Sequence, residues 1–424
     1  MGLAACRPDA SLDAAATTST DDSGDTSPLT DGSTSTGEDP PPAELCDDTC
    51  TPLLLPTWEY VGPSGSLAVL ELLLDADGSL LLGLQRTDGE LALLRLSATG
   101  DLLWAVAPSL PCAPCELEDL ALHPSGDIII SATSPQQLDA STGSIEPSEA
   151  ILARFDVASD QLAWAQRSPL RVGPEAQPRA GEVAVLDEDR IIHAILDGNS
   201  NGESLALRDF EADGTLRDSE VVLAQPGTGE GWSPLLTTSP TGELLLAHEF
   251  WDPGEELFTG SSWRLAPPSY EIISGVGFPV PLDELAVDAA GRRVELSHSR
   301  ASQSVTLLLT NRRSSDPERW SASLPIVSTS EARPSLALGP DGDIYVAARA
   351  TPRVDPSDPY VVMLEVARWS SQGRLRWHAQ RSLDMMATAD PVELLVDADE
   401  GLVVGTVVLG RLHVVRYEQT CACD

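Results

Sequence analysis

Beyond residue 57 the chain alternates short apolar runs with turns rich in Gly, Asp and Pro, and no sustained helical period competes with this pattern. The clearest unit is LDADGSLLLG at Leu74–Gly83. It predicts two strands joined by a tight turn, in which Gly78 supplies the positive φ that a short hairpin needs. The basic element of this chain is therefore a β-hairpin.

The second strand of this hairpin recurs along the chain. Each copy is mostly apolar and ends in Gly, Ser or Ala, which favours a strand that a neighbouring strand approaches closely. The seven copies are LLLG (Leu80–Gly83), IIIS (Ile128–Ser131), IIHA (Ile191–Ala194), LLLA (Leu244–Ala247), VELS (Val294–Ser297), IYVA (Ile344–Ala347) and LVVG (Leu402–Gly405).

A second hairpin follows each of several copies, as in LLRLSATGDLLWA at Leu93–Ala105. Each repeat of about 50 residues then holds four strands, A to D, which is typical of a propeller blade. The sequence predicts an all-β fold over residues 51–424, a seven-bladed β-propeller of four-stranded antiparallel blades. Register in the third and seventh blades assumes that Asp189 and Glu400 take the place of the hairpin Gly.

The ring is predicted to close through the N-terminal end of this region. The last repeat ends after a third strand at Arg411–Glu418, whereas an unassigned strand, TWEYVG at Thr57–Gly62, precedes the first repeat. Its Trp58 matches the tryptophans at the same place in strand D of other blades, Trp104, Trp164, Trp320 and Trp377. We therefore expect this strand to complete the last blade.

The pattern of a turn ending in Gly followed by Trp resembles the repeat of quinoprotein-like propellers, seen here at Gly100 and Trp104 and in two or three other blades. The resemblance implies either a catalytic member, with adjacent cysteines beside a quinone and a bound calcium, or a non-catalytic binder or scaffold of the cell envelope. No two cysteines are adjacent in this chain, which favours the non-catalytic relatives.

Residues 1–50 read as a separate segment. Residues 7–44 consist mainly of Ser, Thr, Asp, Gly and Pro, a composition that cannot bury enough apolar surface to offset its ordering entropy, so a disordered tether is expected. The preceding Leu3-Ala4-Ala5-Cys6 resembles the cleavage box of bacterial lipoproteins, in which the cysteine is lipidated. The resemblance implies export and anchoring at Cys6 to the bacterial cell envelope or surface; the alternative is an ordinary disordered N-terminus.

Charge limits the partners. The chain has 66 acidic residues against 26 basic ones, all Arg, and a net charge of −40. Such a polyanion repels nucleic acid and anionic lipid headgroups, so contact with a membrane is expected only through the lipid anchor. The absence of Lys removes P-loop and Schiff-base chemistry. We expect a monomer whose ligand is a protein or a glycan.

Seven cysteines are grouped as one near the start and three close pairs. Export favours disulfides among the six in the pairs, although the spacing of the central pair also fits a zinc knuckle. The pairs are Cys46 with Cys50, Cys112 with Cys115, and Cys421 with Cys423. The outer two pairs flank the predicted closure, where cross-links would clasp the ring.

The candidate ligand face is the one that carries the D-to-A and B-to-C connections. Its B-to-C loops are long at Thr133–Glu149, Trp251–Ser261 and Ala350–Pro359, whereas the opposite turns are short. The position seven residues before each hairpin Gly is acidic in five blades and is expected to form an acidic ring at the channel mouth: Glu71, Asp119, Glu182, Glu284 and Glu393, with Leu235 and Ser335 in the other two. The alternative is that these carboxylates only accept backbone hydrogen bonds or are solvated.

One loop has the beginning of a calcium site. Asp197, Asn199 and Asn201, followed by Gly202, match the start of a calcium loop, but its twelfth position holds Arg208 in place of an acid. The alternative is a hairpin loop of turn-forming residues. Calcium is thus the one cofactor the sequence suggests.

Two functions remain. The first is a cell-envelope lipoprotein that acts as a binding or scaffold module through the loop-rich face. The alternative is a calcium-dependent or quinoprotein-like enzyme, a lyase, hydrolase or dehydrogenase, that uses the same face. Three histidines in or beside strand B of successive blades, His193, His248 and His298, have different offsets, which favours core histidines over a shared site.

Overall fold

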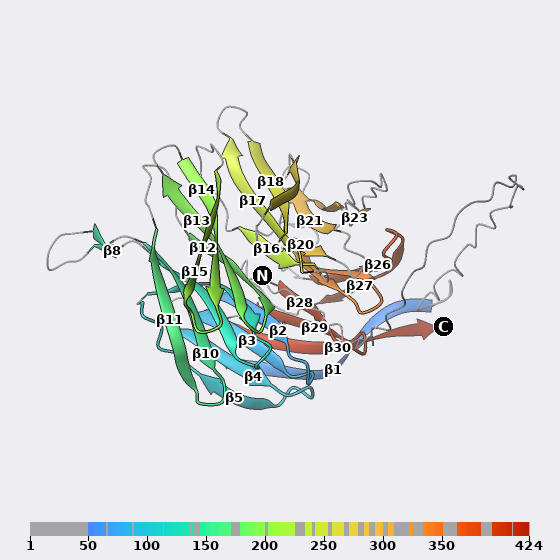
Figure 1. The fold of residues 1–424 in the computed structure, drawn as a ribbon. Coiled ribbons are helices and arrows are strands. Elements are labelled where there is room, and N and C mark those ends of the chain that lie inside the picture. Colours follow the sequence, from blue (N-terminus) through green and yellow to red (C-terminus); the bar gives the residue numbers. More distant parts are fainter. Residues whose placement is uncertain are drawn as a thin grey trace, which may run out of the picture.

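The computed structural model describes residues 50–64, 67–86, 89–112, 114–135, 137–138, 145–146, 148–170, 179–199, 202–224, 234–239, 242–252, 257–266, 271–278, 284–287, 293–299, 304–308, 322–324, 334–350, 363–382, 392–408 and 410–423. All regular structure in these ranges is β-strand. The strands form seven four-stranded antiparallel sheets and one two-stranded sheet (Figure 1). The predicted all-β propeller class is confirmed.

The first three sheets, blades 1 to 3, follow the chain from its N-terminal side. Blade 1 holds β2 (Leu67–Leu74), β3 (Leu80–Arg86), β4 (Leu91–Leu96) and β5 (Leu102–Val106). Blade 2 holds β6 (Glu116–Leu122), β7 (Ile128–Ser134), β10 (Glu149–Asp156) and β11 (Gln161–Pro169). Blade 3 holds β12 (Arg179–Asp187), β13 (Arg190–Asn199), β14 (Gly202–Glu211) and β15 (Leu216–Ala224). The two-stranded sheet, β8 (Gln137–Leu138) with β9 (Ile145–Glu146), lies between β7 and β10.

Blades 4 to 7 continue the same order of strands A to D. Blade 4 holds β16 (Leu235–Thr238), β17 (Leu244–Asp252), β18 (Leu257–Ala266) and β19 (Glu271–Phe278). Blade 5 holds β20 (Glu284–Val287), β21 (Arg293–Ser299), β22 (Ser304–Leu308) and β23 (Ala322–Leu324). Blade 6 holds β24 (Ser335–Leu338), β25 (Ile344–Ala350), β26 (Met363–Trp369) and β27 (Leu375–Ser382). Blade 7 holds β28 (Val392–Val396), β29 (Leu402–Val408), β30 (Arg411–Cys423) and β1 (Cys50–Ser64).

The A strands form a closed circle of contacts. In sequence order β2 contacts β6, β6 contacts β12, and the series continues through β16, β20, β24 and β28, which returns to contact β2. Because each A strand contacts the A strand before it and the A strand after it in this series, the blades are arranged around a central axis, as Figure 1 shows.

The predicted closure is confirmed, and its strand is longer than expected. Strand β1 pairs antiparallel with β30, with Trp58 opposite Arg416. Pairing begins at Cys50, opposite Cys423, although the sequence predicted a strand only from Thr57. The residues before Thr57 include two prolines, which argue against a central strand but are tolerated at an edge. Strand β1 is such an edge, because it is the outermost strand of blade 7.

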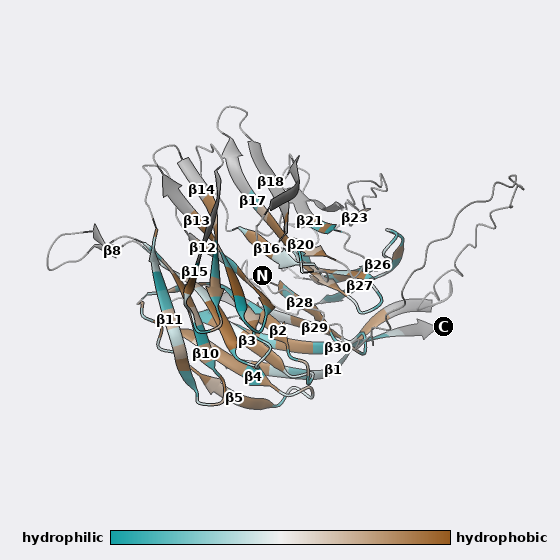
Figure 2. Cartoon of the chain, in the orientation of Figure 1, coloured by the Kyte–Doolittle hydropathy of each residue, from teal (hydrophilic) through white to brown (hydrophobic). Residues whose placement is uncertain are grey.

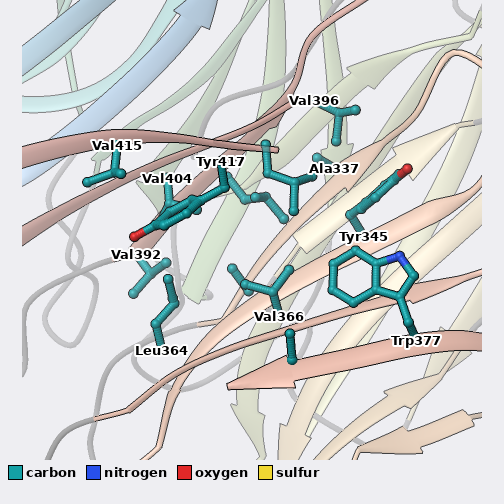
Figure 3. Close-up of a cluster of buried hydrophobic side chains, with 14 residues drawn as sticks. Ala337, Tyr345, Leu364, Val366, Trp377, Val392, Val396, Val404, Val415 and Tyr417 are labelled. Carbon is teal, nitrogen blue, oxygen red and sulfur yellow. The ribbon is translucent and has the colours of Figure 1, made fainter. Parts of the chain in front are cut away.

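Apolar side chains fill the spaces between successive blades. Figure 2 shows hydrophobic residues along the strands of the ring, and Figure 3 shows the cluster between blades 6 and 7, where Val366 and Trp377 of one blade face Val404 and Tyr417 of the other. A corresponding cluster between blades 7 and 1 includes Val414. Each blade is thus stabilised by burial against both neighbours.

The hairpin turns explain the repeated glycines. Gly78, Gly126, Gly242 and Gly342 all have φ between 79° and 89°. In blade 7 the non-glycine Glu400 takes this conformation with φ 60°, as the alignment assumed. Asp189 also takes the place of the hairpin Gly in register, because Val185 pairs with Ile191 as Leu74 pairs with Leu80. It does so without a positive φ, in a tighter hairpin that pairs Asp187 with Arg190.

Trp58 docks β1 against blade 1. Its Nε1 donates a hydrogen bond to the carbonyl of Ala98 at 3.0 Å, and a Cβ on Gly100 would lie only 2.5 Å from its ring. Gly100, at φ +83°, therefore leaves the space in which the indole lies.

We predict that Trp58→Ala lowers the free energy of unfolding by about 2–3 kcal/mol, because it removes the ring that joins blades 7 and 1. Leu55→Ala on the same strand is the control. Its side chain is 51% exposed, so a change within about 0.5 kcal/mol is expected. Urea denaturation measures both. Equal losses would contradict a closure that depends on this docking.

Candidate functional site

The five predicted ring residues lie at one structural level around the axis. Strand pairing sets Glu71 opposite Gly83, Asp119 opposite Ser131, and Glu393 opposite Gly405. In the two blades without an acid at this level, Leu235 lies opposite Ala247 and Ser335 opposite Ala347. We call the acidic members the carboxylate belt: Glu71, Asp119, Glu182, Glu284 and Glu393.

Belt residues begin strand A only in some blades. Glu284 is the first residue of its strand, whereas Glu71, Asp119 and Glu182 lie several residues inside theirs. All five side chains are buried, with exposures between 1% and 8%. The belt is therefore enclosed by neighbouring blades.

Small residues opposite the belt permit this enclosure. A Cβ at Gly83 would lie 2.4 Å from Cδ1 of Leu120, a residue of the next blade. The Gly that ends the repeated motif of blade 1 is thus explained by the close approach of the following blade. The copy predicted at Val294–Ser297 is one residue out of register, because Glu284 lies opposite Leu296 and not opposite Ser297.

Three belt carboxylates accept a backbone N–H from the next blade. Asp119 Oδ2 accepts the N–H of Val183 at 2.7 Å, and Glu182 Oε2 accepts that of Leu236 at 2.6 Å. Glu284 accepts the N–H of Leu336 in the same way. Each donor is the residue that follows the belt position of its own blade.

The pattern continues in blade 6, which has no acid at this level, because the Ser335 hydroxyl accepts the N–H of Leu394 at 3.0 Å. This position therefore links blade to blade through a side chain and a backbone amide. It corresponds to the simpler of the two sequence interpretations, in which the carboxylates accept backbone hydrogen bonds.

The belt is also one electrostatic unit. Burial raises the pKa of Glu182 to about 8, and the carboxyls of Glu71 and Glu393 act in the same direction. Burial, followed by the carboxyls of Glu182 and Glu71, holds the pKa of Asp119 well above its usual value. Burial and the Glu393 carboxyl do the same to the pKa of Glu284. Low polarity and like charges thus favour the protonated forms.

A second set of polar links lies on the turn face, which carries the A–B and C–D hairpins. In blade 1, Arg95 Nη2 lies 2.8 Å from Asp75 and 2.9 Å from Asp77, so a guanidinium occupies the space between the two turn aspartates. In blade 6, Arg368 joins Asp343 of its own hairpin, at 2.7 Å, to Glu400 of blade 7, at 2.9 Å. These turn carboxylates are neutralised by arginine.

Blade 3 has the same pair with its charges exchanged. Asp209 lies opposite Ile192 on strand C, where other blades carry the arginine, and its Oδ2 contacts Arg190 at 2.6 Å. Arg190 directly precedes Ile191, where blade 2 has Asp127 before Ile128. The exchange keeps the ion pair that blades 2 and 6 form between these two positions. In blade 1 the first position is Ser79, and Arg95 pairs with other turn residues.

Tryptophans on strand D reinforce these links. Trp164 Nε1 donates to the carbonyl of Ala212 in the next blade at 2.9 Å, and its ring covers Gly214, as Trp58 covers Gly100. Trp320 lies outside the described residues. The Gly–Trp pattern is therefore explained by docking between blades.

His193 and Ser131 form a buried pair. Ser131 Oγ donates to the carbonyl of Gly181 at 2.5 Å and lies 2.9 Å from His193 Nε2, so the imidazole N–H must donate to the hydroxyl. Burial lowers the pKa of His193 to about 3, which keeps the ring neutral. Because the imidazole donates to the hydroxyl and does not accept from it, the pair lacks the geometry of an activated nucleophile.

The calcium-loop candidate falls on a hairpin. Asp197 pairs with Ser204 and Asn199 with Gly202, so their backbone continues the β13–β14 ladder. The side chains of both residues and all of Asn201 lie outside the described part of the structure. Within that part, no group of three or more His, Cys, Asp or Glu residues is placed to hold a metal ion.

Cys112 and Cys115 form a disulfide, with their Cα atoms 5.4 Å apart, so zinc ligation by this pair was the wrong alternative. Gln85 donates to the Cys115 carbonyl and accepts the N–H of Leu117, which holds the crossover between blades 1 and 2. Cys6 and Cys46 lie outside the described residues. For Cys50, Cys421 and Cys423 only the backbone is described.

We predict that Glu182→Gln stabilises the protein increasingly as pH rises from about 4.5 to 8. The native pKa is raised, so the parent bears no ionisation penalty in acid and the full penalty above the native pKa. The amide oxygen can still accept the Leu236 N–H. We expect a gain on the order of 1–3 kcal/mol at pH 9 and little at pH 4.5. Glu188→Gln, at an exposed turn of the same blade, is the control for thermal unfolding at both pH values. Equal gains at both pH values would contradict a buried, protonated belt.

We further predict that Arg190→Asp and Asp209→Arg each destabilise blade 3 by about 3 kcal/mol, since each places like charges at a buried pair. The double exchange restores the order of charges found in the other blades. In a double-mutant cycle measured by denaturation, the double variant should regain more than half of the unfolding free energy that the less stable single variant loses. A double variant that loses the sum of both single effects would refute direct pairing.

Comparison with known proteins supports no assignment beyond the fold. No family model matches the chain, and no curated protein matches its sequence. Solved structures with a similar arrangement include the propeller of Dos1, at 12% identity over 82% of this chain and 78% of that one, with a TM-score of 0.44. An α-L-arabinofuranosidase from Fusarium graminearum matches at 11% identity over 87% and 98%, with a TM-score of 0.47. A glucose dehydrogenase matches at 13% identity over 86% and 98%, with a TM-score of 0.38. The described strands themselves, in their four-stranded sheets and closed circle of contacts, identify this chain as an all-β propeller protein.

Proposed function

We propose that this protein is an exported lipoprotein of the bacterial cell envelope, anchored at Cys6, that binds a protein or glycan partner through the loop face of its propeller. The observation that carries the proposal is the difference between the two faces of the ring. Most hairpins of the turn face are short and are closed by arginine ion pairs or docked tryptophans. The exception is the C–D connection of blade 5, which runs from Leu308 to Ala322. On the loop face the connections from β7 to β10 and from β25 to β26 are long, as predicted. The prediction was wrong for Trp251–Ser261, because β17 and β18 pair as far as Asp252 opposite Leu257 and leave only a short loop.

The longest of these connections includes structure of its own. Between β7 and β10, whose ends pair at Ser134 and Glu149, the chain forms the additional sheet β8–β9. In Figure 1 strand β8 lies away from the four-stranded sheets. Because a ladder that ends in this way needs only a two-residue turn, the extra residues do not serve the blade, and a role in contacting a partner accounts for them.

The negative charge of the chain indicates which kind of partner it would bind. Described arginines such as Arg95, Arg154 and Arg368 are largely buried in links between turns and blades. Basic groups are thereby withdrawn from the surface of a chain with a net charge of −40. The proposed partner is accordingly a neutral glycan or a protein surface with basic groups.

The proposed anchor fits the place where the tether enters the ring. Strand β1 begins at Cys50, on the outermost strand of blade 7. A flexible tether of residues 7–49 would have a root-mean-square span of roughly 40 Å, enough to keep the propeller clear of headgroups that repel it. Within the described residues no helix is long and apolar enough to cross a bilayer.

We predict that replacing residues 136–147 with Asn-Gly lowers the affinity for the partner at least tenfold and leaves the melting temperature unchanged. The assay is a glycan array together with quantitative binding to envelope proteins, using unlipidated Cys6→Ser protein. Glu188→Gln, on the turn face, should bind normally. If the loop variant still bound the partner and Glu188→Gln did not, the proposal that the partner binds the loop face would be refuted. Calcium-dependent turnover of a bound glycan would favour the enzyme alternative instead.

We also predict that Cys6→Ser moves the protein from the membrane fraction to the soluble fraction and abolishes incorporation of labelled palmitate. The Cys112→Ser/Cys115→Ser variant should remain in the membrane fraction, because its cysteines belong to the propeller. An unlabelled parent protein found in the soluble fraction would exclude the lipid anchor.

A further inference from the structure

We propose that Cys50 and Cys423 form a disulfide that joins the two ends of the propeller. The strand pairing places the two residues directly opposite each other, as the terminal pair of the β1–β30 ladder. Opposed residues of antiparallel strands have Cα atoms about 4.5–5.5 Å apart. That separation lies within the range of about 4.4–6.8 Å that a disulfide requires.

The register that creates this pair is continuous. From Cys50 opposite Cys423 to Pro56 opposite Tyr417 every residue is paired in turn, and the first irregularity lies between Pro56 and Trp58. A slip of one residue would place Cys50 opposite Ala422 and would break every pair of this continuous segment. The unbroken register from Cys50 to Pro56 is therefore what aligns the cysteines.

The remaining cysteines fit one further bond. Cys112 and Cys115 are already joined, and Cys6 is the proposed lipid site. Residues two apart on a strand lie on the same face, so Cys421 shares a face of the ribbon with Cys423. A bond between Cys50 and Cys423 leaves Cys421 to pair with Cys46, which precedes β1 by only a few residues.

The bond forms by thiol–disulfide exchange with an oxidant disulfide of the exporting compartment. The thiolate of one cysteine attacks the oxidant, one oxidant sulfur leaves as a thiolate, and a mixed disulfide forms. The thiolate of the second cysteine then displaces the other oxidant sulfur. Two electrons pass to the oxidant, and the two protons lost by the cysteines end on its two thiols. Oxidised glutathione serves as this oxidant in the test.

Peptide mapping tests the connection. In a Cys6→Ser/Cys46→Ser/Cys421→Ser variant refolded with oxidised glutathione, trypsin should yield the peptide ending at Arg86 linked to Tyr417–Asp424. In the unaltered protein, cleavage before Asp48 separates Cys46 from Cys50, and electron-transfer fragmentation separates Cys421 from Cys423. Linkage of Cys50 to Cys423 supports the proposal. Free thiols at both positions, or Cys50 linked to Cys46 or Cys421, overturn it.

Thermal unfolding tests the consequence. The proposed bond closes almost the whole chain, whereas Cys112–Cys115 closes a loop of four residues, and the chain-entropy model predicts a larger effect for the longer loop. Cys50→Ser/Cys423→Ser should lower the melting temperature on the order of 5 °C. Cys112→Ser/Cys115→Ser should lower it less, and a reductant should lower the parent toward the Cys50→Ser/Cys423→Ser value. If Cys50→Ser/Cys423→Ser lowers the melting temperature no more than Cys112→Ser/Cys115→Ser does, the proposed Cys50–Cys423 bond is overturned.

Discussion

Strand β1 supplies the outer strand of blade 7, and the closed ring depends on its pairing with β30. Without this pairing, β30 would be an open edge, and the apolar cluster between blades 7 and 1, which includes Leu82, Leu395 and Val414, would lose the Trp58 and Tyr60 rings that pack against it. Other blades are each made from one continuous piece of chain. Only at this seam does the ring rely on residues from both ends of the sequence.

Two levels of polar contact hold the blades in order around the apolar clusters. Near the axis, belt side chains accept backbone N–H groups of the next blade. On the turn face, arginines and tryptophans reach the hairpins of their own and neighbouring blades. Burying a carboxylate is costly, and the raised pKa of Glu182 shows how that cost is met, because the protonated form carries no charge into the interior. The same arrangement draws Arg95, Arg154 and Arg368 inward, whereas Arg86 and Arg167 remain about half exposed.

Much of this fold was predictable because the patterns that specify it are local in the sequence. Apolar alternation and turn glycines located the hairpins, and the match of Trp58 to other strand-D tryptophans located the closure. The start of β1 was missed, since Pro52 and Pro56 argue against a strand unless it is known to be an edge. The hairpin at Asp187 was located, but its tighter closure, without a positive φ at Asp189, was not visible in the sequence.

The belt shows a different limit of sequence reasoning. Spacing identified its five positions, but Asp119, Glu182 and Glu284 each bind a backbone amide, which has no identity that a sequence can reveal. The exchange of Arg190 and Asp209, in contrast, was visible in the aligned repeats as a reversal of charge at two positions. Comparing pairs of positions between blades, and not single positions, would have found it.

The place of β1 also has a consequence for the order in which the protein is made. Strand β1 leaves the ribosome before any blade exists, and its partner β30 is synthesised after the strands of all the other blades. Blades 1 to 6 can each pair their strands as they emerge, but β1 must wait without a sheet until β30 has been made. The ring therefore closes only after six blades have been synthesised, and until then the chain carries β1 as an unpaired strand.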